Sequence, residues 1–96
     1  MKELKNYYDE PIRVVAATDD VFEQDFLMAL VDKYGRAIRR AAQLGGRYIE
    51  AVQTLLDMEW SMVYGSVYRD FTSHVTINVN KSDGDIRIIF TTTSIY

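Results

Sequence analysis

The chain has 96 residues, of which 48% are apolar, and a formal net charge of −3. This length and composition predict one domain over residues 1–96 with a single core. Because the chain has no Cys and one His, disulfides and thiolate metal sites are excluded, and we expect neither a metal nor a cofactor. No stretch approaches the ~20 apolar residues of a membrane span, and the start lacks the apolar region of a signal peptide. We therefore expect a cytoplasmic protein without a membrane partner.

The N-terminal part of the chain is polar up to its single proline. We expect residues 1–10 to form a mobile tail, and Pro11, which has no backbone N–H to donate, to mark the entry to the first strand. Residues 12–18 then alternate, with β-branched side chains at the front. This pattern predicts a short strand that turns Arg13 outward.

A capping signal follows that strand. Asp20 precedes Glu23 by three residues, and this spacing resembles a capping box, in which side-chain oxygens accept from the first free N–H groups of a helix. We therefore expect a first helix that begins near Val21. Its apolar residues occupy two faces, so it should be buried on two sides.

A second helical pattern runs on across a pair of glycines. Apolar residues recur at spacings of four and three, which favours one long helix through Gly45-Gly46. The members of this stripe are Tyr34, Ile38, Ala41, Gly45, Tyr48, Val52 and Leu55. Because two interior glycines cost ~2 kcal/mol relative to alanine, the alternative is a helix that ends at Leu44 and restarts at Arg47.

The last part of the chain has the period of strands. Residues 74–80 and 86–91 alternate on either side of a Lys-Ser-Asp-Gly turn, which predicts a β-hairpin. Residues 59–71 also alternate and predict a longer strand. The expected fold class is α+β, with a four-stranded, mostly antiparallel sheet packed on one face by two or three helices, in the order β-α-α-β-β-β.

Charge is unevenly distributed along the chain. Residues 33–47 carry five basic side chains and no acidic one, whereas residues 1–32 carry three basic and eight acidic ones. The basic residues are Lys33, Arg36, Arg39, Arg40 and Arg47. Four of them, all but Arg39, fall within an arc of about 60° on a helical wheel, opposite the apolar stripe. Such a face is either a solvated helix surface or a contact for phosphates. The guanidinium group of arginine binds phosphate through two parallel hydrogen bonds.

An aromatic face is the second candidate surface. If residues 59–71 form a strand, Trp60, Tyr64 and Tyr68 align on one side of it, beside Arg13 and Arg87. Aromatic side chains on an open sheet stack on unpaired bases, worth ~1 to 3 kcal/mol per base. The alternative is that these aromatic residues belong to the core or form a dimer contact.

Together these surfaces favour sequence-independent binding of single-stranded nucleic acid. We expect DNA first, although base stacking and phosphate contacts would serve RNA as well. The expected contacts are Arg13, Arg36, Arg39, Arg40, Arg47, Trp60, Tyr64, Tyr68 and Arg87. No acid and base pair lies within a catalytic motif, so we do not expect an enzyme. The alternative is a protein-interaction module that forms a homo-oligomer through the aromatic sheet face.

Two families resemble parts of the chain. The order of a Tyr-rich start, a strand, helices with the arginine-bearing run from Tyr34 to Ala41 and a terminal sheet resembles the ThermoDBP family of archaeal single-stranded-DNA-binding proteins. The resemblance implies binding of unpaired DNA in a cleft with an apolar floor and basic flanks. That family dimerises through a C-terminal leucine zipper, which these residues lack. The run from Gly35 to Ala41 also resembles a segment of the Alba chromatin proteins.

Overall fold

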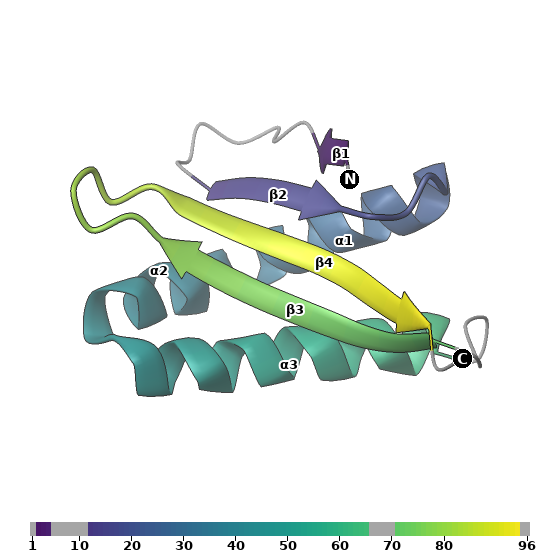
Figure 1. Ribbon diagram of the computed structural model, residues 1–96. Coiled ribbons are helices and arrows are strands. Elements are labelled where there is room, and N and C mark those ends of the chain that lie inside the picture. The colour runs from purple at the N-terminus through teal and green to yellow at the C-terminus, as the bar shows by residue number, and fades with distance from the viewer. Residues whose placement is uncertain (1, 5–11, 66–70, 95–96) are drawn as a thin grey trace.

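The computed structural model describes residues 2–4, 12–65 and 71–94, and these fold into a sheet covered on one face by helices. In chain order, the elements are β1 (Lys2–Leu4), β2 (Ile12–Ala16), α1 (Val21–Lys33), α2 (Gly35–Leu44), α3 (Gly46–Tyr64), β3 (Phe71–Val79) and β4 (Ile86–Ser94). The strand order is β1-β2-β4-β3 (Figure 1). The α+β class and the four-stranded sheet are therefore confirmed. None of the described helices is both long and apolar enough to span a bilayer.

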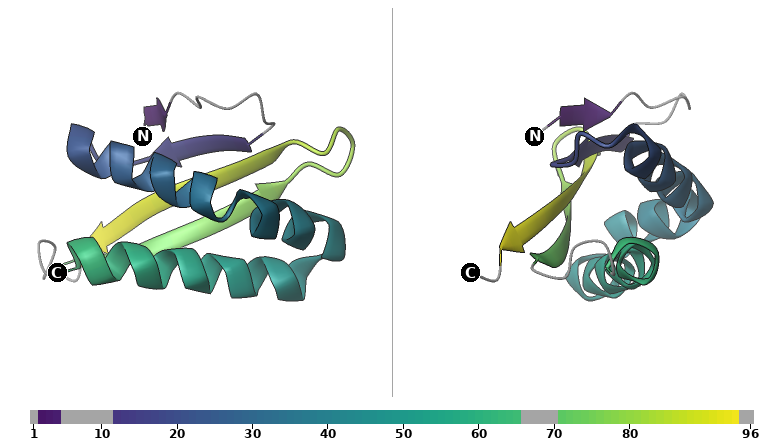
Figure 2. Two further views of the ribbon diagram at one scale, coloured as in Figure 1. Left: turned by 180° about the vertical axis from the view of Figure 1, so that it is seen from behind. Right: turned by 90° about the vertical axis from the view of Figure 1, so that its right-hand side faces the viewer.

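The sheet is mixed rather than uniformly antiparallel. The β1–β2 and β3–β4 pairs are antiparallel, whereas β2 and β4 run parallel, with Val14 opposite Ile88. A parallel pair requires a crossover, which here contains all three described helices. Because the crossover returns to the same face, α1, α2 and α3 form one layer, and no described helix covers the other face of the sheet (Figure 2).

The core lies between the sheet and this helix layer. Alternate residues of β2 and β4 point inward, including Val14 and Ile88, and they meet Leu27, Ile38 and Leu56 of the three helices. The inward positions of β2 and of the hairpin are those that alternation predicts. Their outward neighbours form the uncovered face of the sheet.

The helix layer differs from the expectation at the glycine pair. The predicted long helix is wrong, because α2 ends at Leu44 and α3 begins at Gly46. Gly45 sits between them with φ of 105°, a conformation that costs L side chains steric strain, so the chain turns there. The turn also resets the helical phase. As a result, Tyr48 and Leu55, predicted to continue the buried stripe, are exposed.

Two further expectations are wrong. Residues 59–64 continue α3 as helix instead of starting a strand, and β3 begins only at Phe71. The fourth strand is β1, within the expected mobile tail, where Leu4 is buried against the core. The observed order is therefore β-β-α-α-α-β-β. Residues 5–10 of that tail lie outside the described residues.

Candidate nucleic-acid interface

The outer side of α2 carries the predicted arginines. The helix buries Gly35, Ile38 and Ala41 against the core, and the helical period places Arg36 and Arg40 on the opposite side, with Arg39 at the border of the buried side. Arg36 and Arg40 are exposed and Arg39 is half-buried. We call these three side chains the arginine face. Arg47, in the first turn of α3, is also exposed.

Most of these cations have no acidic neighbour. Among the residues that the structure describes, no carboxylate lies within ion-pair distance of Arg36, Arg40 or Arg47. Cations one turn apart on a helix repel each other by a few tenths of a kcal/mol. An anionic ligand would relieve this repulsion.

Lys33, the fifth member of the predicted basic cluster, has a different role. Its Nζ atom lies 3.4 Å from Oε1 of Glu59 on α3, and the hydroxyl of Tyr34 donates to the same oxygen. The hydrogen bond from Tyr34, and then the charge of Lys33, hold the pKa of the Glu59 carboxyl below its usual value. Lys33 therefore links α1 to α3 and is engaged by an acid.

The corner between α2 and α3 is open and unobstructed. A Cβ atom added at Gly45 or Gly46 would meet nothing within 4 Å. The N-terminus of α3, which follows, has no side-chain cap. The free N–H groups at the start of a helix carry partial positive charge. The electrostatic potential at this corner is therefore positive, like the charges of Arg40 and Arg47 beside it.

Two of the predicted arginines lie on the uncovered face of the sheet. Arg13 and Arg87 are directly opposite each other on β2 and β4, and both are exposed. The neighbouring residues on each strand point into the core toward the helices, so these arginines point away from α2. Nε of Arg13 lies 3.5 Å from Oδ2 of Asp85. The structure therefore does not bring Arg13 and Arg87 together with the arginine face.

The predicted aromatic sheet face is wrong. Trp60 lies on α3, is 3% exposed, and contacts Phe90 edge to face with 5.5 Å between ring centroids. Its indole Nε1 donates to Oε1 of the buried Glu23 at 2.8 Å. Tyr64 is half-buried beside Phe26, with ring centroids 5.3 Å apart. Trp60 is therefore a core residue, as the alternative interpretation had it, and presents no face to a base. Tyr68 lies outside the described residues.

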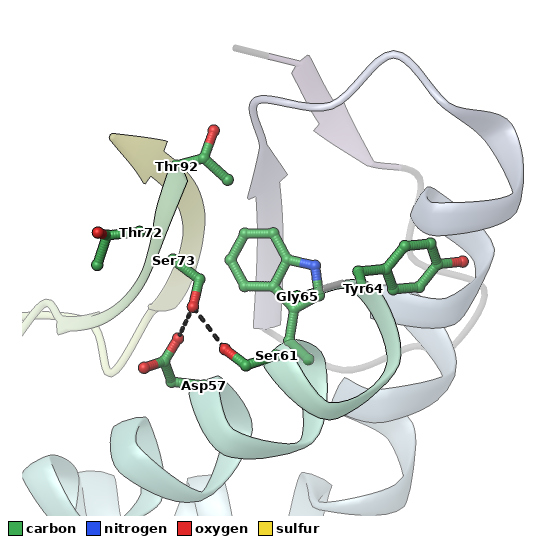
Figure 3. A pocket seen from close by; sticks show the side chains of 8 residues that line it. Asp57, Ser61, Tyr64, Gly65, Thr72, Ser73 and Thr92 are labelled. Atoms are coloured by element: carbon green, nitrogen blue, oxygen red, sulfur yellow. Dashed lines mark hydrogen bonds between the residues drawn. The ribbon is translucent and has the colours of Figure 1, made fainter. Parts of the chain in front are cut away.

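A pocket of about 300 Å³, with polar and aromatic side chains in its lining, opens where α3 ends beside the start of β3 (Figure 3). Oγ of Ser73 lies 2.5 Å from Oδ1 of Asp57 and 2.7 Å from Oγ of Ser61. Because an ionised carboxylate only accepts, Ser73 donates to Asp57 and Ser61 donates to Ser73. One turn before Asp57, Oε1 of Gln53 accepts from the backbone N–H of Ile77 at 2.8 Å.

These hydrogen bonds join α3 to β3, the edge strand of the sheet. The bond from Ile77 to Gln53 also satisfies a backbone N–H at a strand edge that would otherwise be open to pairing with another chain. The hydroxyl proton of Ser61 points to a neutral serine oxygen rather than to a base, so this arrangement does not activate Ser61 as a nucleophile. The pocket is best explained as part of the contact between α3 and the sheet.

Sequence reasoning missed the links made by Glu23 and Asp57. Both carboxylates were available in the sequence, but their partners come from distant elements. Among the described residues, no group of three His, Asp or Glu side chains is placed to hold a metal ion.

No family model, curated protein or solved structure matches this chain.

Proposed function

We propose that this protein binds the phosphate backbone of nucleic acid, without sequence preference and without catalysis, through the arginine face of α2. The observation that carries the proposal is the pair of exposed guanidinium groups, Arg36 and Arg40, that have no carboxylate neighbour among the described residues. In an acidic protein, such local segregation of charge favours contact with a polyanion.

The spacing of the arginine face suits a repeating anion. Arg36 and Arg40 are one helical turn apart, about 6 Å along the axis at 1.5 Å per residue, so each can engage a separate phosphate. Arg39 lies at the edge of this side of α2, and Arg47 extends the positive surface onto the start of α3. Because Trp60 is buried, the proposal now rests on phosphate contacts and not on stacking by the predicted aromatic face.

Single-stranded DNA is the first ligand to test, because the resemblance to the ThermoDBP family points to it. RNA carries the same phosphates and remains within the proposal, and a cytoplasmic location goes with either ligand. Arg13 and Arg87 are left out of the proposed contact, because they lie on the other side of the sheet.

The test is fluorescence anisotropy with a labelled oligo-dT over a series of salt concentrations. If four phosphates are neutralised, the logarithm of the association constant should fall with the logarithm of salt concentration with a slope of roughly −2.8. The double variant Arg36→Gln/Arg40→Gln should lower affinity by about tenfold per arginine, since charged hydrogen bonds are worth about 1.5 to 3 kcal/mol, and should reduce the slope by about 1.4.

The matched control is Arg13→Gln/Arg87→Gln, which removes the same charge from the uncovered face of the sheet. It should bind within about twofold of the parent protein. Absence of binding at low salt, or an equal loss of affinity in the control, would reject the arginine face as the site.

A further inference from the structure

The outer side of α3 carries a continuous apolar stripe. Its large members are Tyr48, Leu55, Met58 and Met62, exposed by 52%, 37%, 58% and 82%, and Ala51 completes the row. Successive members are separated by three, four, three and four residues. This is the seven-residue repeat by which one helix packs along another.

Within the part of the chain that the structure describes, the core does not include this stripe. Leu56 and Trp60, on the opposite side of α3, supply its contacts with the core. Single exposed apolar side chains are common on proteins, but this row extends for about 21 Å along one helix, at 1.5 Å per residue. A contiguous apolar surface of that kind marks an interface.

The polarity of α3 indicates what covers the stripe. Arg47 lies at the N-terminal end of the helix, whereas in its C-terminal half Glu59 is paired with Lys33 and Asp57 accepts from Ser73 of β3, so neither carboxylate faces a partner. The helix dipole is positive at the N-terminus, where Arg47 lies, and negative at the C-terminus. The dipole therefore favours a second copy of α3 in the reverse direction.

The neighbouring helices strengthen this polarity. The end of α2, with Arg40, adjoins the start of α3. The start of α1, which Asp19 and Asp20 precede, lies at the same end of the molecule as the end of α3 (Figures 1 and 2), and Phe26 of α1 contacts Tyr64 there. One end of the helix layer is thus basic and the other acidic.

We propose that two copies of this chain form a dimer by packing α3 antiparallel against α3 along the stripe. The two-fold axis passes near Leu55, midway between Tyr48 and Met62, so that Tyr48 of each copy meets Met62 of the other. A parallel pair would place like charges and like dipole ends together. The contact is isologous, since each copy contributes the same surface, and it closes at two subunits. This inference does not depend on nucleic-acid binding.

The oligomeric state tests the proposal directly. Two helices of this length bury less than a standard interface, so we expect a concentration-dependent dimer with a Kd on the order of micromolar. Sedimentation equilibrium of the full chain should show a mass that rises from 11.1 kDa toward twice that value between about 1 and 100 μM. A monomer throughout that range would overturn the proposal.

Matched variants locate the contact. Met58→Asp/Met62→Asp should be monomeric at 100 μM, and both side chains are exposed enough that folding, followed by circular dichroism, should be retained. The control is Phe22→Asp on α1, which alters an equally exposed apolar side chain away from the stripe. If Phe22→Asp dissociates the dimer and the stripe variant does not, the interface is elsewhere and the proposal fails.

Cross-linking tests the orientation, since the chain has no cysteine of its own. An equal mixture of the Tyr48→Cys and Met62→Cys variants should oxidise mainly to the mixed disulfide. Predominant disulfides within each variant would indicate parallel helices and overturn the antiparallel arrangement. Neither readout involves nucleic acid, so a failure here is distinguishable from a failure of the proposed binding function.

Discussion

The two helices on either side of Gly45 have similar inner sides and very different outer ones. Ile38 of α2 and Leu56 of α3 are both fully buried in the same core. Outward, α2 presents arginines, whereas α3 presents leucine, methionine and tyrosine. Packing against the sheet constrains only the inner side of a helix. The outer sides are therefore where two neighbouring helices of one layer can acquire different partners.

The largest expected effect comes from the inner sides that the two helices share. Ile38→Ala and Leu56→Ala should each lower the free energy of unfolding by about 2 to 5 kcal/mol, because each leaves a cavity in a closely packed core. Chemical denaturation measures both. A cost well under 1 kcal/mol for Ile38→Ala would mean that α2 is not held in the position that presents its arginines.

The corner that separates the two helices gives the next effect. Gly45→Ala should destabilise the protein by about 1 to 3 kcal/mol, because φ of 105° is strained for any residue with a Cβ atom. Gly46→Ala is the control, since Gly46 has open space around its Cα and no positive φ. Its unfolding free energy should stay level or rise by up to about 1 kcal/mol. Equal costs at the two positions would contradict the sharp boundary between α2 and α3.

The smallest effect concerns the link between Lys33, a member of the predicted basic cluster, and Glu59 of α3. The pKa of Glu59 is lowered in the folded protein by the hydroxyl of Tyr34 and by Lys33, from an ordinary value of 4.5. Its stabilising contribution is therefore present above pH 4.5 and is lost as the pH falls through the lowered pKa. Glu59→Gln should be less stable than the parent above that window, with the difference vanishing in more acidic solution. A pH-independent difference in denaturation midpoint would contradict the link.

The hairpin and β2 were predictable from the sequence, because their alternation of apolar and polar residues fits a strand and not a helix. Val75 and Ile77 of β3 are buried and Thr76 between them is exposed, which only a strand on a core produces at that spacing. The shared side of Arg36 and Arg40 was likewise predictable, since charges four residues apart share a side of a helix whatever it packs against. Lys33 and Arg47, predicted on the same helical face, lie instead on α1 and α3.

The segment from Trp60 to Tyr64 could not be assigned in the same way. A spacing of four residues fits both periods, since it places two side chains on one face of a strand and also on one face of a helix. Trp60 is a core residue because it packs against Phe90, and this contact joins residues that are thirty positions apart in the sequence. The strand β1 was hidden because three residues, two of them charged, show no clear alternation.

The apolar stripe of α3 was concealed by the glycine corner. Tyr48 and Leu55 continue the buried stripe of α2 only if the helix runs straight through Gly45, and the turn there moves them to the outer side. Because of the backbone conformation at Gly45, Tyr48 and Leu55 are not core residues and instead belong to the proposed dimer contact.

The two proposals together assign nucleic acid to the outer side of α2 and a second copy of the chain to the outer side of α3. The most direct test measures both the mass and the oligo-dT affinity of two variants, one altered on each helix. We expect Arg36→Gln/Arg40→Gln to remain a dimer, because the apolar stripe and Arg47 of α3 are unchanged, while its affinity for oligo-dT falls about a hundredfold, as two charged contacts at about tenfold each imply. We expect Met58→Asp/Met62→Asp to become a monomer whose affinity per chain stays within a few-fold of the parent at matched salt. If both properties fell together in either variant, the division of roles between α2 and α3 would be contradicted.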